Sequence, residues 1–328
     1  MYSTGGSEDT KLALLAEIGS RAVRLGLTGE DGRLRRDTIR SYSPEEQSTI
    51  SGALGAFADA SHLPRLPRRC AIAVSGTPVG DTISVTNSRW IVSRSGLAAM
   101  LQAPPLILND FAAHAWALST SDSGARVEQI AGAPLRVAEP GTRCLIGVGS
   151  GLGVAVLTHG EDGHLGVLST AAGHSHFMGE PPELKDLLQR MRVTNGAASA
   201  EDILSERGLL AIYREIAGPA AAQSTDAATI IRLGVSGHDV NARKTAELFV
   251  RTLWHFAGNM VLTYGAWNGV LFTGRIADAL RPLIAKPGTG DNFLIRSPLQ
   301  RRMRDVPRAL VALDHAELRG AAQALLLH

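Results

Sequence analysis

Residues 143–158 read RCLIGVGSGLGVAVLT, and this stretch limits which folds are possible. The apolar run 143–148 predicts a buried strand, and residues 154–158 predict a second strand. Four glycines in seven positions separate them: Gly147, Gly149, Gly151 and Gly153. Alternating glycines leave a concave run of backbone N–H groups that can face an anion, and Ser150 stands among them. The segment matches neither the P-loop nor the dinucleotide-binding fingerprint, so a plain hairpin turn remains the alternative.

A second strand-turn-strand unit lies near the N-terminus. Residues 11–16 and 24–28 predict two strands, and residues 17–23 predict the turn between them, with Glu17 and Gly19 at its start. Like the first hairpin, this turn places small residues and N–H groups where a phosphate can approach.

The remaining pattern alternates strands with helices, which indicates an α/β protein. A capping box at Ser43 and Glu46, with Pro44 between them, predicts a helix to about Ala60. Residues 120–126 predict a surface loop, and apolar spacing over residues 249–264 predicts a long core helix. Further strands are expected at residues 70–75, 82–86, 105–109, 269–273 and 309–313, and further helices at residues 276–285 and at the C-terminus.

Asn109 and Asp110 follow a short buried strand, which is where α/β proteins place ligand chemistry. A carboxylate at this position can accept a hydroxyl proton. The alternative is an N-cap for a helix that opens at Phe111, because Asp and Asn are preferred caps.

Three further motifs each have a functional and a structural interpretation. His174 and His176, with His164 upstream, suggest a metal site, but no cysteines or clustered carboxylates complete it, and hydrogen-bonded histidines are favoured. Ser199 predicts a helix cap with Glu201 or Asp202 facing the dipole. Gly274 marks a strand-to-helix turn, or a glycine required by packing. None of these motifs decides a function alone.

Composition narrows the class of protein. The chain has 328 residues, enough for two domains, and a formal net charge of +2, which argues against a nucleic-acid-binding face. Cys70 and Cys144 are the two cysteines, too few for a disulfide framework. Apolar runs are too short for a membrane span, and the first ten residues do not resemble a secretory signal. We therefore expect a cytoplasmic protein that binds neither nucleic acid nor membranes.

Taken in chain order, these segments resemble the bacterial glucokinases of the actin-like sugar kinase superfamily. Thr86, Asn87 and Trp90 are similar to the hairpin of that family's small domain. The other segments that carry the resemblance are residues 108–113, 147–155, 173–174, 199–205, 257–259 and 269–274. The resemblance implies a two-domain α/β fold of the actin-like (ribonuclease H-like) type, with the ligands in a cleft between domains. Residues 11–118 with 314–328 would form the small domain, and residues 119–313 the large one.

The resemblance also implies an ATP-dependent hexose kinase that uses Mg²⁺. Asp110 would be the catalytic base and would also contact the sugar, whose other hydroxyls Asn109, His174 and Glu201 would bind. The nucleotide would be held by residues of both hairpins and the adenosine motif: Glu17, Gly19, Gly147, Gly149, Ser150, Gly151, Gly153 and Gly274. Mg²⁺ would accompany ATP, near Glu17, without a protein metal cluster, and a homodimer is the implied assembly.

The chain departs from the family pattern at three ligand-binding segments. The family's first phosphate loop reads Asp-x-Gly-Gly-Thr-Asn, whereas this chain has Glu17 followed by Gly19, Ser20, Arg21 and Ala22. A positive φ at Ser20 would be strained, and Arg21 could either clamp a phosphate or fill its place. We therefore expect weak or redirected activity, and the alternative is a non-catalytic sensor of sugar or nucleotide.

Two further positions support the same expectation. Ala171 stands where the family has a sugar-binding Glu, and Arg275 where the adenosine motif has its second Gly. Losing the charged partner of a sugar hydroxyl costs on the order of 1.5–3 kcal/mol.

Overall fold

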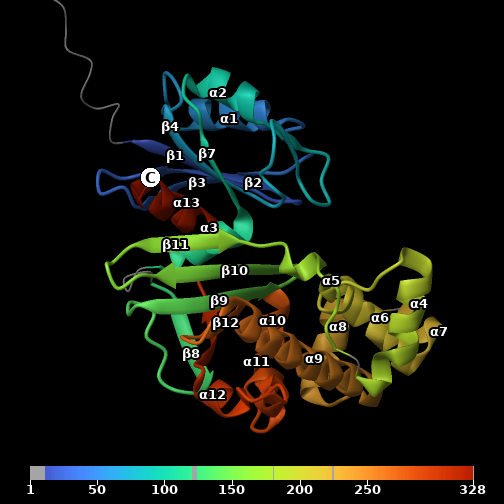
Figure 1. Ribbon diagram of the computed structural model, residues 1–328. Coiled ribbons are helices and arrows are strands. Elements are labelled where there is room, and N and C mark those ends of the chain that lie inside the picture. The colour runs from blue at the N-terminus through green and yellow to red at the C-terminus, as the bar shows by residue number, and fades with distance from the viewer. Residues whose placement is uncertain (1–11, 120–123, 180, 224, 328) are drawn as a thin grey trace, which may run out of the picture. The chain divides into compact units, whose positions relative to one another are not determined.

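The computed structural model describes residues 12–119, 124–179, 181–223 and 225–327 (Figure 1). The chain divides into two compact units, which are described separately: unit 1 is residues 1–123 with 314–328, and unit 2 is residues 124–313. Lys11, the expected start of the first strand, and residues 120–123 of the expected surface loop lie outside the described residues.

Unit 1 is built on a five-stranded sheet in the order β3-β2-β1-β4-β7. β1, β2 and β3 are antiparallel neighbours, whereas β4 and β7 run parallel to β1. The last residues of β1, β4 and β7 share one register, so their carboxyl ends meet at one edge of the sheet. The strands are β1 (Ala13–Ile18), β2 (Val23–Thr28), β3 (Leu34–Tyr42), β4 (Arg69–Val74) and β7 (Leu106–Asn109).

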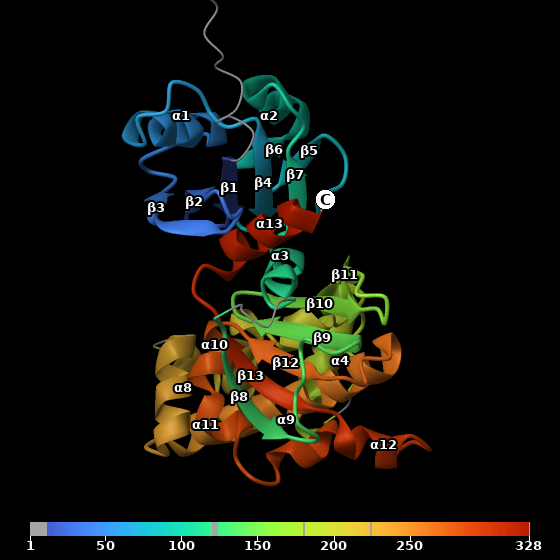
Figure 2. The same ribbon diagram turned by 90° about the vertical axis from the view of Figure 1, so that its left-hand side faces the viewer.

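Both faces of this sheet are covered (Figure 2). One face packs against α1 (Ile50–Ala60), α2 (Arg94–Leu101) and the hairpin β5–β6 (Thr82–Ser84 and Ile91–Ser93), with Phe57 and Trp90 in its core. The other face packs against α13 (Ala316–Leu327), which in turn lies against α3 (Asp110–Ala117). A Cβ at Gly320 would overlap the carbonyl of Ala113, so α13 approaches α3 closely only because residue 320 is glycine. This contact ties the C-terminal segment to the sheet edge that carries Asn109 and Asp110.

Unit 2 contains a six-stranded sheet in the order β11-β10-β9-β12-β13-β8. β9, β10 and β11 are antiparallel, β12 and β13 run parallel to β9, and β8 pairs antiparallel with β13. The strands are β8 (Arg126–Ala131), β9 (Gly141–Val148), β10 (Leu152–His159), β11 (Leu165–Ser169), β12 (Val270–Thr273) and β13 (Arg308–Ala312).

The core of unit 2 lies between this sheet and a group of helices around α9 (Val240–Tyr264). Trp254 of α9 is fully buried and meets Phe272 of β12 edge-to-face, with ring centroids 4.8 Å apart. The other helices are η1 (Ala172–His174), η2 (Pro182–Leu184), α4 (Lys185–Asn195), α5 (Ala200–Ile203), α6 (Glu206–Ala217), α7 (Pro219–Gln223), α8 (Ala227–Ser236), α10 (Arg275–Ala279), α11 (Arg281–Ile284), η3 (Thr289–Phe293) and α12 (Gln300–Asp305).

The two sheets repeat one plan. Each contains three consecutive strands that pair antiparallel, followed by two strands parallel to the first of the three: β1-β4-β7 in one unit and β9-β12-β13 in the other. Both expected hairpins, β1–β2 and β9–β10, therefore occupy equivalent positions in the two sheets, and β8 is an additional strand at the far edge of the unit 2 sheet. The predicted α/β class is confirmed.

Two predicted helices were wrong in extent. Ser43 and Glu46 do exchange capping hydrogen bonds, but only a turn follows, and α1 begins later at Ile50 with Thr49 as its cap. The helix expected over residues 276–285 is divided into α10 and α11. Pro282 explains the break, because it lacks an N–H group and its ring clashes with the carbonyl four residues earlier.

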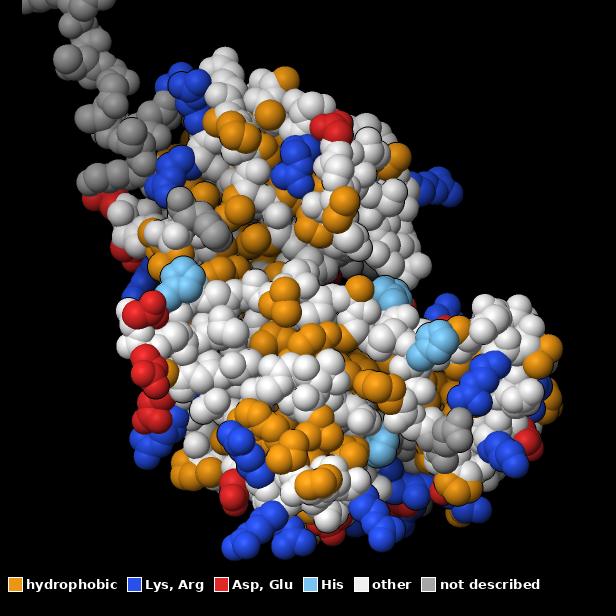
Figure 3. Space-filling model, viewed as in Figure 1, with side chains coloured by type: hydrophobic (Ala, Val, Ile, Leu, Met, Phe, Trp, Pro, Cys, Tyr) orange, Lys and Arg blue, Asp and Glu red, His pale blue; other side chains and the backbone are white. Residues whose placement is uncertain are grey.

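The face shown in Figure 3 carries acidic and basic side chains in small separate groups. This distribution agrees with the near balance of 33 basic and 31 acidic residues. Among the described residues, no helix is both long enough and apolar enough to cross a membrane.

Candidate functional site

Asn109 ends β7 and caps α3. Its Oδ1 accepts hydrogen bonds from the N–H groups of Phe111 (3.0 Å) and Ala112 (3.3 Å). Its Nδ2 donates to the carbonyl of Gly76 (3.1 Å) and to Oδ1 of Asp110 (3.0 Å). The capping alternative is thus correct for Asn109, while Asp110 is the first residue of the helix. The same side chain that begins α3 fixes the orientation of the neighbouring carboxylate.

Asp110 is held at the carboxyl edge of the unit 1 sheet. Its Oδ1 accepts from the Phe111 N–H (2.9 Å) and from Asn109, and the Ser75 side chain is a further hydrogen-bond partner. Burial raises the pKa of Asp110 to about 6, against the hydrogen bonds that lower it, and the charge of Glu17 raises it further. A carboxylate with a pKa this close to neutrality is suited to take and return a proton.

Glu17 lies in β1, one residue before its end, and not in the turn where we expected it. The apolar run that predicts the strand ends at Ala16, so it did not predict that the strand continues through Glu17 to Ile18. Oε1 forms an ion pair with Arg24 of the adjacent strand β2, at 2.5 Å. Oε2 is buried and has no hydrogen-bond partner among the described residues. This oxygen is therefore available to an additional donor or cation.

Glu317 of α13 joins this acidic group, and sequence reasoning missed it. Burial raises the pKa of Glu317 to about 7, and the charges of Glu17 and Asp110 raise it further. Nδ1 of His114 lies 3.7 Å from Oε1 of Glu317, but burial lowers the pKa of His114 to about 4. The imidazole of His114 is therefore neutral at pH 7 and does not neutralise the negative charge of the Glu317 carboxylate. Only the close approach of α13 to α3 brings these residues together.

The turn between β1 and β2 is short and unstrained. The N–H of Gly19 donates to the carbonyl of Ala22 (3.1 Å), and Ser20 does not have a positive φ. The strain considered for Ser20 is absent. Arg21 is exposed at the tip of the turn and makes no hydrogen bond or ion pair with a described residue. Its guanidinium is therefore free to meet an anion.

In unit 2 the glycine-rich segment forms the β9–β10 hairpin. Gly147 and Gly153 belong to the strands and pair with each other, so the turn is shorter than expected. The N–H of Gly149 donates to the carbonyl of Gly151 (2.9 Å), which closes the turn. The N–H groups of Ser150 and Gly151 have no partner within the described part of the chain. A Cβ on Gly149 would meet nothing within 4 Å, so open space lies beside these donors.

Glu201 lies against this turn. Its Oε2 accepts a hydrogen bond from the N–H of Leu152 (3.0 Å), and a Cβ on Gly151 would lie 2.6 Å from the same oxygen. The predicted cap is confirmed beside it: Ser199 and Asp202 form a capping box at the start of α5. Asp202 thus completes the cap at the start of α5, and Glu201 is left to face the turn.

Gly173, which precedes His174, packs against the same residue, Leu152. A Cβ on Gly173 would overlap the carbonyl of Leu152, so this position requires glycine. His174 ends η1 and is exposed, and the neighbouring Ala171 is exposed as well. His164 and His176 are also exposed. Within the described ranges, no group of three or more His, Cys, Asp or Glu side chains could hold a metal ion.

Gly274 opens α10 with a φ of +94°, and a Cβ there would lie 2.5 Å from the carbonyl oxygen of Val148. Both interpretations of Gly274 are therefore correct: it forms the turn between β12 and α10, and packing leaves no room for a side chain there. Arg275 forms an ion pair with Glu206, the first residue of α6. The Glu206 N–H donates to the carbonyl of Gly149 (2.9 Å), so this pair lies next to the hairpin turn. Sequence reasoning noted Arg275 but not Glu206.

The structure therefore forms two groups of predicted residues, one in each unit. Unit 1 brings Glu17, Asn109 and Asp110 to one sheet edge, with Gly19 just beyond it. Unit 2 gathers its residues around the β9–β10 turn: Gly147, Gly149, Ser150, Gly151, Gly153, His174, Glu201 and Gly274. The free N–H groups and open space at the turn fit a phosphate. In unit 1, the unpartnered Oε2 of Glu17 fits a cation.

Comparison with known proteins agrees with this arrangement. The family model described as Glucokinase matches residues 14–328. Glucokinase from Stenotrophomonas maltophilia (strain R551-3) is 33% identical, over 96% of this chain and 95% of its own. Glucokinase from Xanthomonas campestris pv. campestris (strain B100) is 32% identical, over 95% and 94%.

Solved structures show the same fold at lower identity. A glucokinase from an Antarctic psychrotroph superposes with a TM-score of 0.79 at 24% identity, covering 97% of this chain and 99% of its own. Glucokinase from Balamuthia mandrillaris, solved in complex with glucose, gives 0.78 at 19% identity, over 96% and 93%.

The repeated sheets and these matches define an α/β protein with the actin-like fold of the sugar kinases. The matches along almost the whole chain go further: the chain belongs to the glucokinase family.

Proposed function

We propose that this protein transfers the γ-phosphoryl group of ATP to a hydroxyl of a hexose, with glucose as the first candidate. The observation that carries the proposal is the state of Asp110. Its carboxylate is fixed by Asn109, Ser75 and the N-terminus of α3, and its pKa of about 6 leaves it mostly ionised at pH 7. Such a group serves as a general base at neutral pH.

In this mechanism Asp110 accepts the proton of the sugar hydroxyl as the hydroxyl oxygen forms a bond to the γ-phosphorus. The bond between that phosphorus and the bridging oxygen breaks, and ADP leaves with the bond's electron pair. Phosphoryl transfer needs little covalent participation from the protein, so positioning and electrostatic stabilisation supply most of the catalysis.

Asn109, Glu201 and His174 are the proposed sugar-binding residues. Glu201 uses Oε2 to accept from the Leu152 N–H, which leaves Oε1 for a hydroxyl donor. His174 is exposed at the end of η1 and has both ring nitrogens available to the ligand. Ala171 offers no charged partner to a sugar hydroxyl. We therefore propose that this protein binds glucose more weakly than family members that have Glu at this position, or that it prefers another hexose.

The β9–β10 turn is the proposed phosphate site. The N–H groups of Ser150 and Gly151 would donate to phosphate oxygens, and the absence of a Cβ at Gly149 leaves room for them. Mg²⁺ bound with ATP would neutralise charge on the phosphates, and Glu17 is the carboxylate that would face it. Arg21 would supply a further positive charge from the exposed β1–β2 turn.

A non-catalytic sensor is the second candidate, and the Arg275–Glu206 pair favours it. The pair occupies the junction of α6 and α10 beside the β9–β10 turn, where the family resemblance places the adenosine. If the pair keeps nucleotide out, the chain would bind sugar without transferring phosphate.

The test is ADP release from Mg-ATP with a panel of hexoses, with the sugar phosphate identified by phosphorus NMR. Release of ADP matched by one sugar phosphate supports the kinase. Folded protein that binds a hexose but releases no ADP with any member of the panel supports the sensor and contradicts the kinase.

A further inference from the structure

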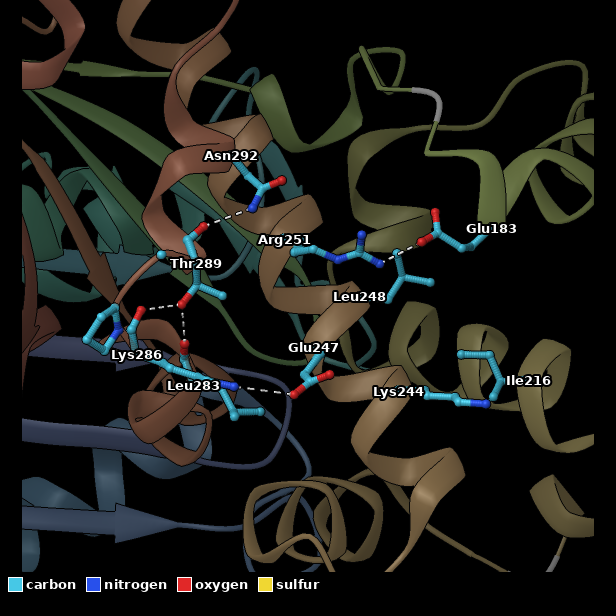
Figure 4. Close-up of a pocket in the computed structure, with 12 residues that line it drawn as sticks. Glu183, Ile216, Lys244, Glu247, Leu248, Arg251, Leu283, Lys286, Thr289 and Asn292 are labelled. Carbon is cyan, nitrogen blue, oxygen red and sulfur yellow. Dashed lines mark hydrogen bonds and ion pairs between the residues drawn. The ribbon is translucent and has the colours of Figure 1, made fainter.

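A cavity of about 600 Å³ lies in unit 2 on one side of α9 (Figure 4). Lys244, Glu247, Leu248 and Arg251 line it from α9, at the spacing that places side chains on one helix face. The C-terminal end of α11 and the following loop form a second wall, and the ends of α6 and η2 form a third. Its volume falls within the range typical of small-molecule sites, roughly 300–1,000 Å³. None of the residues assigned to the proposed kinase site lines this cavity.

Three cationic side chains face the cavity from two different elements: Lys244, Arg251 and Lys286. Lys244 extends from α9 toward Ile216 (Figure 4) and makes no ion pair or hydrogen bond with any described residue. Nζ of Lys286 lies 3.7 Å from Oε1 of Glu247. Nε of Arg243 lies 3.2 Å from the same oxygen, so the Glu247 carboxylate pairs with two cations. The cavity lining carries three cations against two carboxylates, Glu183 and Glu247.

Arg251 forms an ion pair with Glu183 at 2.7 Å, and this pair lies between two neighbouring cavities. Glu183, Leu248, Arg251 and Asn292 also line a neighbouring cavity of about 300 Å³. The side chains of Arg251 and Glu183 are 44% and 45% exposed. An ion pair this exposed contributes little to stability, so an anionic ligand can replace Glu183 as the partner of the Arg251 guanidinium at little cost.

The remaining lining fits a small organic skeleton. Ile216, Leu248 and Leu283 supply apolar surface. The Asn292 Nδ2 donates to the Thr289 carbonyl (3.0 Å), which leaves its amide oxygen to accept from a ligand hydroxyl. Two kinds of anionic ligand can be compared. A carboxylate ligand carries one negative charge and needs only one of the three cations, whereas a phosphate monoester carries about −1.5 to −2 charges and three acceptor oxygens, and so makes use of several cations. The planar fork of Arg251 suits phosphate, and lysines act as point charges beside it.

We propose that this cavity binds the phosphate monoester of a small metabolite, with Arg251 on the phosphate and the flexible side chains of Lys244 and Lys286 turning toward it from their positions beside Ile216 and Glu247 (Figure 4). The site is separate from the proposed catalytic residues and does not depend on them.

The sequence offers an unusually direct test, because the chain contains only four lysines: Lys11, Lys185, Lys244 and Lys286. Reductive dimethylation with ¹³C keeps their charge and gives each lysine its own NMR signal, assigned with single Lys→Arg variants. The probes are 3-phosphoglycerate and glucose 6-phosphate, with glycerate and glucose as the matched compounds without phosphate.

We expect saturable shifts of the Lys244 and Lys286 signals with at least one phosphorylated probe, and none with its matched compound. Lys185, at the start of α4 and outside the cavity lining, should not move. Absence of these two shifts with both probes would overturn the proposal. Equal shifts of all lysine signals would also overturn it, because they would report ionic strength alone.

Unmodified protein gives a second readout. Lys244→Gln should weaken binding of the active probe by about fivefold or more in calorimetry, as expected for loss of a charged hydrogen bond. Lys185→Gln is the matched control and should bind as the wild type does. An equal loss in both variants would contradict the assignment to this cavity.

Discussion

The N–H of Leu152 donates a hydrogen bond to Oε2 of Glu201, at 3.0 Å. This bond connects the β9–β10 turn, proposed to bind phosphate, to a carboxylate proposed to bind the sugar. Gly173, beside His174, packs against the carbonyl of the same Leu152. Leu152 thus contacts one proposed sugar ligand directly and packs against the residue before the other, so changes in the turn should affect sugar binding as well as nucleotide binding.

The turn itself offers a matched pair of variants. In Gly151→Ala the new Cβ would lie 2.6 Å from Oε2 of Glu201 and must displace it, so KM for the sugar should rise by about tenfold or more. In Gly149→Ala the Cβ meets no protein atom within 4 Å, so thermal stability should not change. It would, however, occupy the space proposed for phosphate, so KM for ATP alone should rise. Steady-state kinetics with each substrate varied in turn would separate the two effects, and identical profiles for the two variants would contradict the assignment.

The Arg275–Glu206 pair is predicted to limit nucleotide affinity. Arg275→Gly restores the residue found in the family's adenosine motif and removes the guanidinium beside α6. We expect KM for ATP to fall roughly fivefold, which corresponds to about 1 kcal/mol. Stability should change by less than about 1 kcal/mol, because both side chains are substantially exposed. Arg190→Gly, in another exposed pair on α4, controls for loss of a surface charge. An unchanged or higher KM for ATP in Arg275→Gly would show that the pair does not obstruct the nucleotide.

Ala171 is the position where a single substitution should improve sugar binding. Ala171→Glu introduces a carboxylate on the exposed segment just before Gly173 and His174. A charged hydrogen bond to a sugar hydroxyl is worth on the order of 1.5–3 kcal/mol, so KM for glucose should fall about tenfold or more. The matched variant Ala171→Gln controls for size without charge. Equal kinetics for all three proteins would mean that residue 171 does not reach the sugar.

The carboxyl group of Glu317 gives a prediction about pH. Its pKa is raised to about 7 in the folded protein, above the value of about 4.5 expected when unfolded, so the folded state binds the extra proton. The folded state therefore loses stability as pH rises from about 4.5 through 7. Glu317→Gln removes this loss and should raise Tm at pH 8 but leave it nearly unchanged at pH 4.

The same variant should leave the acid limb of catalysis nearly unchanged. The charge of Asp110 raises the pKa of Glu317 to about 7, so Glu317 is still mostly protonated and uncharged near pH 6, where Asp110 titrates, and Glu317→Gln should keep the acid limb of the kcat profile near pH 6. Melting curves and rates measured across this range test both effects. A Tm difference that does not depend on pH would contradict the assignment of the titration to Glu317.

Much of the fold follows from local sequence pattern. Apolar runs and glycine turns predicted both hairpins and most strands, because buried strands and tight turns leave local signals. β3 was not predicted, since residues 34–42 are largely polar and half of the strand is exposed. Glu17 was assigned to a turn because a charged residue rarely occurs in a buried strand. Its partner Arg24 lies on the neighbouring strand, where sequence spacing does not reveal it.

The candidate site was predictable where its residues carry motifs, and not where tertiary contacts create it. Asp110 and Glu201 stand beside caps that can be read from the sequence. Glu317 and Glu206 join the site only through the packing of α13 on α3 and of α6 on the hairpin turn. Nothing near them in sequence marks either glutamate as functional.

The central claim is that Asp110 is the base of a hexose kinase, and Asp110→Asn tests it most directly. The amide keeps the size of the side chain but cannot accept the hydroxyl proton. With the sugar that gives the highest wild-type rate of ADP release, kcat should fall by about 10²–10⁴. The variant should still melt cooperatively and bind that sugar. A folded Asp110→Asn variant that turns over within a few-fold of the wild-type rate would contradict the account.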